Sequence, residues 1–167
     1  MIRIVACILL AVSLTAYAGE TKTVSDEDKQ YTIELPSDWV HSVQNNRFVS
    51  VMACQANDTA KMNERLNVVV SKSGGRLKSA YKDLIDEFEN FDEFEALQEG
   101  EGQLADQPCR WFVYTMAGGE PGKKMKGKQY VLIKDRRLFN IGYLAPEERF
   151  DDAQREFEQM VATFAPR

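Results

Sequence analysis

The chain has 167 residues, with 21 Lys and Arg against 26 Asp and Glu, and a formal net charge of −5 at pH 7. This length suits one ordinary domain with a single hydrophobic core. The acidic balance argues against a nucleic-acid partner and against general attraction to anionic lipid.

Residues 1–18 have the pattern of a signal peptide. Arg3 supplies the basic start, residues 4–14 are largely apolar, and the small residues Ala16 and Ala18 mark a cleavage site near Ala18. The apolar run is shorter than the ~20 residues that a membrane-spanning helix requires. We therefore expect export to the periplasm or beyond, without a stable membrane anchor. The alternatives are a buried N-terminal strand and a membrane anchor.

The next elements are predicted as a leader followed by strands. Residues 19–30 are polar and acidic, and we expect a flexible leader there. Residues 31–35 alternate apolar and polar side chains, which is typical of a half-buried strand, and Pro36 begins a turn that includes Trp39. Residues 47–54 and 66–71 are rich in valine and predict two further strands.

The second half of the chain predicts two helices separated by strands. Leu77, Tyr81 and Phe88 belong to one continuous apolar face of a helix. Strands are expected over residues 94–102, 109–117, 129–133 and 138–144, and a last amphipathic helix after Pro146. This order predicts a single α+β domain over residues 31–167, an antiparallel sheet flanked by two amphipathic helices.

The sequence also resembles the PsbP-like group. The segment from Tyr31 to Trp39 is similar to the opening strand and Pro-x-x-Trp turn of that group, and residues 138–164 are similar to its closing strand and helix. The group includes the periplasmic DcrB family and periplasmic immunity proteins of type VI secretion. The resemblance implies a sheet flanked by helices, and it implies no single activity.

Three cysteines are present, and Cys7 lies in the expected signal peptide. The remaining pair, Cys54 and Cys109, predicts a disulfide, because oxidising compartments form and keep such bonds. Two buried thiols, or one reactive thiol, are the alternatives. Trp111 follows Cys109 by two residues, so both side chains should share one face of a strand.

The segment over residues 83–101 holds nine acidic residues and no basic one. Its corner, with Glu89, Asp92 and Glu93, is a candidate Ca²⁺ site, because Ca²⁺ prefers oxygen ligands. The spacing is not that of an EF-hand, and a solvated acidic face explains the same composition. No other cofactor is indicated.

A basic segment follows over residues 123–137. We interpret it as a protein-binding surface, because charged patches steer association with complementary partners; lysines that protect a strand edge are the alternative. The residues expected to bind are Lys123, Lys124, Lys126, Lys128, Arg136 and Arg137.

No catalytic residues are assigned from the sequence. His41 is the only histidine and is expected in a solvated loop. We therefore expect a non-enzymatic, exported protein-binding or accessory protein, for example an immunity-type inhibitor or an envelope assembly factor. The alternatives are a Ca²⁺-dependent or otherwise unrecognised periplasmic enzyme, and a small-ligand carrier. The expected partner is another exported or envelope protein, and the sequence does not indicate an oligomeric state.

Overall fold

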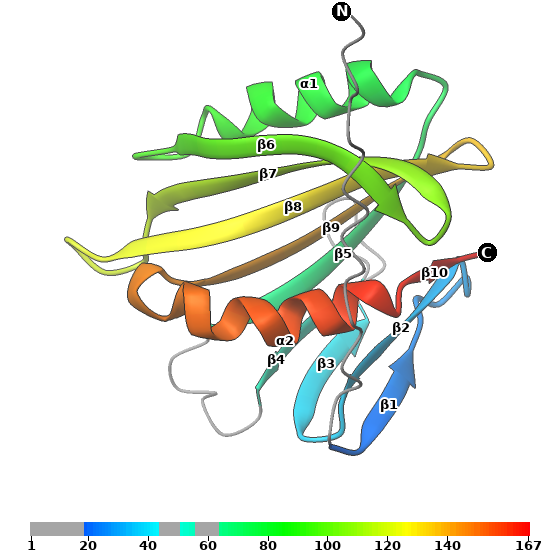
Figure 1. The fold of residues 1–167 in the computed structure, drawn as a ribbon, viewed down its shortest axis with the longest axis horizontal. Coiled ribbons are helices and arrows are strands. Elements are labelled where there is room, and N and C mark those ends of the chain that lie inside the picture. Colours follow the sequence, from blue (N-terminus) through cyan, green and yellow to red (C-terminus); the bar gives the residue numbers. More distant parts are fainter. Residues whose placement is uncertain (1–18, 44–50, 56–63) are drawn as a thin grey trace, which may run out of the picture.

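The computed structural model describes residues 19–43, 51–55 and 64–167 (Figure 1). These residues form two antiparallel sheets and two main helices, so the predicted α+β architecture is confirmed. The expected signal peptide lies outside the described residues. None of the described helices is long and apolar enough to cross a membrane.

The larger sheet has seven strands in the order β3-β4-β5-β9-β8-β7-β6, and every neighbouring pair is antiparallel. The long strands β6, β7, β8 and β9 are neighbours in chain order. On its other side, β9 pairs with β5, which comes earlier in the chain. The strands are β3 (Trp39–Val43), β4 (Val51–Gln55), β5 (Arg65–Lys72), β6 (Glu95–Leu104), β7 (Gln107–Ala117), β8 (Lys124–Lys134) and β9 (Arg137–Pro146).

A smaller sheet contains β1 (Thr21–Val24), β2 (Tyr31–Pro36) and β10 (Ala165–Pro166), in the order β1-β2-β10. The prediction of a flexible leader over residues 19–30 is therefore wrong. The leader forms β1, because Val24 is buried opposite Ile33 of β2. Asp26 is also buried, and its carboxylate accepts hydrogen bonds from the backbone N–H and the side chain of Gln30.

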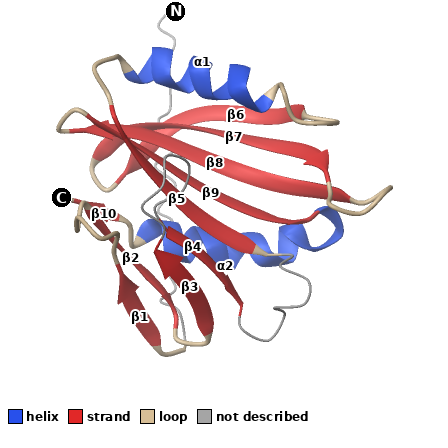
Figure 2. Cartoon of the chain, turned by 180° about the vertical axis from the view of Figure 1, so that it is seen from behind, coloured by secondary structure: helices blue, strands red, loops and turns tan. Residues whose placement is uncertain are grey.

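The two helices cover opposite faces of the larger sheet (Figures 1 and 2). Alternate residues of β7 show this, because Phe112 and Tyr114 pack with α1 (Leu77–Phe88), whereas Cys109 and Val113 belong to the core that includes α2 (Phe150–Ala162). A short 3-10 helix, Glu147–Arg149, precedes α2. The smaller sheet lies beside α2, where Tyr31 packs against Phe164 with ring centroids 5.3 Å apart.

Two tight turns keep the long strands in register. Leu104 pairs with Gln107 across the β6–β7 turn, and Lys134 pairs with Arg137 across the β8–β9 turn. The two central residues of each turn have positive φ, 51° and 58° at Ala105 and Asp106, and 48° and 61° at Asp135 and Arg136. This backbone shape matches the twist of paired strands. It fixes which residues of β6 face those of β7.

Candidate functional site

A groove lies between α1 and the β6–β7 edge of the larger sheet. Helix α1 packs on β7 and β8, and most residues of β6 are exposed. The groove has a volume of about 410 Å³. Its lining consists of Lys78, Ser79, Tyr81, Lys82 and Ile85 from α1, with Glu99 from β6 and Arg110 from β7.

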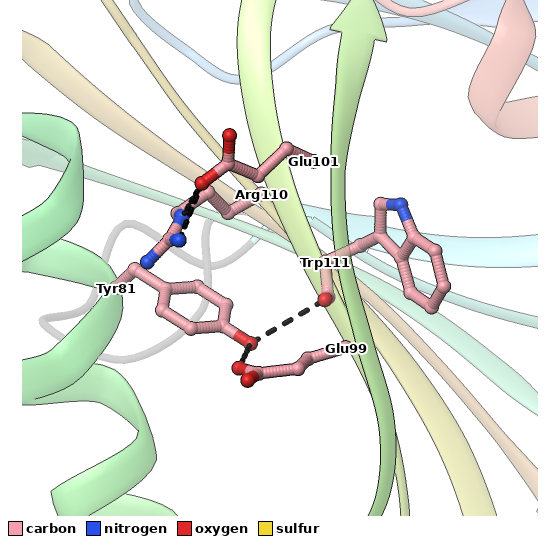
Figure 3. Close-up of polar contacts among 5 residues, drawn as sticks. All are labelled: Tyr81, Glu99, Glu101, Arg110 and Trp111. Atoms are coloured by element: carbon pink, nitrogen blue, oxygen red, sulfur yellow. Dashed lines mark hydrogen bonds and ion pairs between the residues drawn. The ribbon is translucent and has the colours of Figure 1, made fainter. Parts of the chain in front are cut away.

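Tyr81 forms the inner wall of the groove. Its ring is buried and meets Phe112 edge-to-face, with centroids 5.8 Å apart. Its hydroxyl donates to a carboxylate oxygen of Glu99 at 3.0 Å and lies 3.4 Å from the carbonyl oxygen of Trp111 (Figure 3). Burial raises the pKa of Tyr81, and the hydrogen bond to Glu99 raises it further. The phenol therefore stays neutral and fixes the position of Glu99.

Arg110 is held from two sides. Its Nε donates to Glu101 Oε1 at 2.9 Å, and its Nη2 contacts the same oxygen. The guanidinium also lies over the Tyr81 ring, 4.8 Å from the ring centroid (Figure 3). The pairing follows from the strand register, because Glu101 is directly opposite Arg110. The groove thus presents the Arg110 guanidinium and the Glu99 carboxylate, each with a partner within the fold.

The predicted basic surface is divided by the structure. Lys123 and Lys124 are exposed at the β7–β8 hairpin. Lys126 pairs with Asp151 at 3.1 Å, and Lys128 is buried and pairs with Glu158 at 2.7 Å. Both of these lysines contact acids of α2 and are therefore occupied within the fold.

Arg136 lies in the β8–β9 turn and Arg137 begins β9, so both are at the other end of β8. Strand β8 has 11 residues, and a strand rises by about 3.3 Å per residue, so its two ends are roughly 33 Å apart. Arg137 also donates to the carbonyl oxygen of Arg167 at 3.0 Å. The six basic residues do not form one continuous surface.

The predicted Ca²⁺ site is not assembled. Glu89, Asp92 and Glu93 are exposed in the loop between α1 and β6. Within the described part of the chain, no group of three or more His, Cys, Asp or Glu side chains is placed to hold a metal ion. The carbonyl oxygen of Asp92 instead accepts a hydrogen bond from the backbone N–H of Ala117 at 2.9 Å, which holds the corner against β7.

The predicted disulfide between Cys54 and Cys109 is not formed. Cys109 is a free, buried thiol in β7, whereas Cys54 is in β4, and its side chain lies outside the described residues. Strands β5, β9 and β8 separate β4 from β7. Four strand spacings amount to about 19 Å, whereas disulfide-bonded Cα atoms are usually at most about 6.8 Å apart. The strand order therefore contradicts the pairing.

Three further findings concern single side chains named in the sequence analysis. Trp39 is buried against Phe157, so it packs in the core. Trp111 shares its face of β7 with Cys109, as the spacing predicts. His41 is exposed, but it lies in strand β3 and not in a loop.

The groove itself was not predicted from the sequence. Tyr81 was assigned to an apolar helix face, and its hydroxyl has no sequence signal of its own. The available signal was the hairpin: if the β6–β7 turn is centred on Ala105 and Asp106, Glu101 must lie opposite Arg110.

Comparisons with known proteins give the fold a wider context. No family profile matches the sequence, and no curated protein sequence matches it. Solved structures do match. A cyanobacterial PsbP, CyanoP from Synechocystis sp. PCC 6803, has a TM-score of 0.64 at 17% identity, covering 92% of this chain and 95% of CyanoP.

Two other structures share this architecture. LpqN of Mycobacterium tuberculosis, a protein involved in cell envelope biogenesis, has a TM-score of 0.68 at 10% identity, covering 87% of this chain and 90% of LpqN. The Ran-binding protein Mog1p of Saccharomyces cerevisiae has a TM-score of 0.60 at 14% identity, covering 89% of this chain and 96% of Mog1p. The chain has the PsbP-like fold that its sequence resemblance implied.

Proposed function

We propose that this protein is an exported, non-enzymatic binding protein that acts as an accessory factor in the cell envelope. The observation that carries the proposal is the groove of about 410 Å³ between α1 and β6, with Tyr81 and Arg110 held in place by Glu99 and Glu101. A site whose side chains are already ordered loses less conformational entropy on binding. The groove is therefore suited to recognition.

The surroundings of the groove favour a basic partner. Asp83, Asp86 and Glu87 are exposed on α1, and Glu99 and Glu101 are exposed on β6. A surface of one sign accelerates the encounter with a partner of the opposite sign. These acids lie on α1 and β6, the two elements that border the groove, whose own lining includes Lys78, Lys82 and Arg110. The basic residues of the segment over residues 123–137 are divided between two ends of β8.

The fold itself supports an accessory role. LpqN is involved in cell envelope biogenesis, and Mog1p binds Ran. Proteins with this architecture thus include one that acts in an envelope and one that binds another protein. An immunity-type inhibitor is one form of the same role, in which the partner is a toxin. A small-ligand carrier is the second candidate, because the groove volume falls within the range of small-molecule sites.

Site-specific cross-linking in the cell tests the proposal. A photo-reactive residue replaces Lys78, which lines the groove, and in a separate variant Lys123, which lies at the exposed β7–β8 hairpin. We expect a discrete cross-linked protein from position 78 that high salt diminishes. Cross-links from position 123 alone would move the site to the basic hairpin. A small molecule co-purifying with the wild-type protein, with no cross-linked protein, would favour the carrier.

Export is tested separately, by measuring the mass of the protein in the periplasmic fraction. We expect the chain to begin at Gly19. An intact Met1 on a cytoplasmic product would contradict export.

A further inference from the structure

We infer that β6 is a docking strand: an extended segment of the partner, with basic and apolar side chains in alternation, adds to the open edge of the larger sheet. This inference rests on the proposed function and names the partner's chemistry and binding mode. Strand β6 is at the end of the strand order, and within the described residues it pairs only with β7. Unpaired N–H and C=O groups on such an edge are a template for another strand.

The edge is long and accessible. Strand β6 has 10 residues, and eight of them are exposed. Edge strands are often protected by charged side chains, especially lysine, by proline or by a bulge, and the charged residues of β6 are all acidic. The sequence of β6 contains neither lysine nor proline, and its one register shift, between Ala96 and Gln98, leaves residues 98–104 in regular pairing with β7.

The α1 side of this edge selects positive charge. Glu99 and Glu101 lie opposite Phe112 and Arg110, so both carboxylates are on the face that carries the groove. Side chains directly opposite each other on paired strands have Cβ atoms about 4.5–5.5 Å apart. Lysine or arginine at the matching positions of an added strand therefore lies close to these carboxylates, of which Glu101 also pairs with Arg110.

The α2 side of the edge offers an apolar surface. There β6 presents Gly100 and Gly102, which lie opposite Trp111 and Cys109. The Trp111 ring extends over Gly100, because a Cβ atom on that glycine would be 2.5 Å from the ring carbon Cζ2. Trp111 is only partly buried. Because Gly100 has no side chain, an apolar side chain of the added strand can contact the indole directly.

Charge argues against a second copy of this chain as the occupant. Two β6 strands that pair in antiparallel direction around Gly100 would bring Glu99 of one copy against Glu101 of the other. Like charges directly opposite each other destabilise strand pairing, and β6 contains no basic residue to offset them. A basic segment of a different polypeptide has the complementary charge.

The test uses a nine-residue peptide of alternating valine and lysine as the probe, with the mature protein at low salt. Binding is measured by fluorescence anisotropy, and the bound strand is located by amide hydrogen exchange. We expect saturable binding that slows the exchange of alternate amides in β6. Peptides in which glutamate or glutamine replaces lysine should bind at least tenfold more weakly, and these comparisons require no change in the protein.

Matched protein variants test the role of the edge. Glu99→Gln with Glu101→Gln should raise the Kd at least tenfold. Asp28→Asn with Asp152→Asn removes the same charge from exposed positions away from β6, and it should change the Kd less than twofold. Equal effects of the two double variants would overturn the inference.

Other outcomes also decide the matter. Exchange that slows only in α1, or equal binding of the three peptides, would overturn strand addition. Concentration-dependent dimers with protected β6 amides would show that a second copy is the occupant. If position 78 cross-links a partner whose binding leaves β6 exchange unchanged, the groove function stands and strand addition fails.

Discussion

Glu158 on α2 accepts hydrogen bonds from three side chains of the larger sheet. The Lys128 ammonium lies 2.7 Å from Glu158 Oε1, the Tyr143 hydroxyl donates to the same oxygen at 3.3 Å, and the Tyr130 hydroxyl donates to Oε2. Lys128 also lies 4.7 Å from the ring centroids of both Trp111 and Tyr130. A residue predicted to bind a partner thus anchors α2 to β8.

This network predicts a loss of stability at alkaline pH. Burial raises the pKa values of Tyr130 and Tyr143, and the neighbouring Glu158 carboxylate raises them further. Each folded pKa lies above the unfolded value of about 10. Between these values the unfolded chain binds fewer protons, so the free energy of unfolding falls as pH rises. Below pH 10 the contribution is fully present.

Tyr130→Phe removes one of these titrating groups. We expect a loss of about 1 kcal/mol at pH 7 from the missing hydrogen bond. Above pH 10, the free energy of unfolding should fall with pH less steeply in the variant than in the wild type. The two slopes should differ by about 1.4 kcal/mol per pH unit. Urea unfolding at pH 7, 9, 10, 10.5 and 11 measures both effects. Parallel pH profiles for the two proteins would contradict this account.

At the scale of elements, two glycines on β6 provide a matched pair. The substitution Gly100→Ala places a Cβ atom 2.5 Å from the Trp111 ring, whereas in Gly102→Ala it meets Cys109 Sγ at an ordinary 3.8 Å. We expect Gly100→Ala to destabilise the fold by about 1–3 kcal/mol, as overpacking does, and to shift the Trp111 fluorescence. Gly102→Ala should leave both nearly unchanged, and equal effects in urea unfolding and emission spectra would contradict the packing.

Most elements were predictable because their patterns are local. Both main helices follow from apolar spacing, and the chain order of strands and helices gives the α+β class. Strand β8 was predicted too short, because residues 124–128 contain three lysines. They form a strand because Met125 is buried and because Lys126 and Lys128 pair with acids of α2. Strand β1 was missed, since its stability depends on pairing with β2.

At the scale of the whole molecule, the candidate site depended on strand order, which local patterns do not contain. Glu99 and Arg110 line one groove because β6 and β7 are neighbours under α1. The predicted Cys54–Cys109 disulfide was wrong for the same reason. An even number of cysteines does not reveal that three strands lie between β4 and β7. The predicted basic surface was divided for a similar reason. Lys123 and Arg136 are close in sequence, but they lie near opposite ends of β8.

The strand order makes a prediction about the thiols. Unfolded in denaturant without reductant, the mature protein should react with a thiol reagent at both Cys54 and Cys109, and its mass should match two free thiols. In the folded protein, Cys109 should react slowly, because it is buried and burial raises its pKa.

A reducing agent provides an independent measurement of the same feature. A disulfide that closed a loop of this length would stabilise the protein by about 4 kcal/mol, so its reduction would lower the Tm by several degrees. We expect no change in Tm, because the sheet holds β4 and β7 apart without a covalent link. A mass two units lower, together with a Tm that falls on reduction, would instead require β4 to lie elsewhere in the sheet.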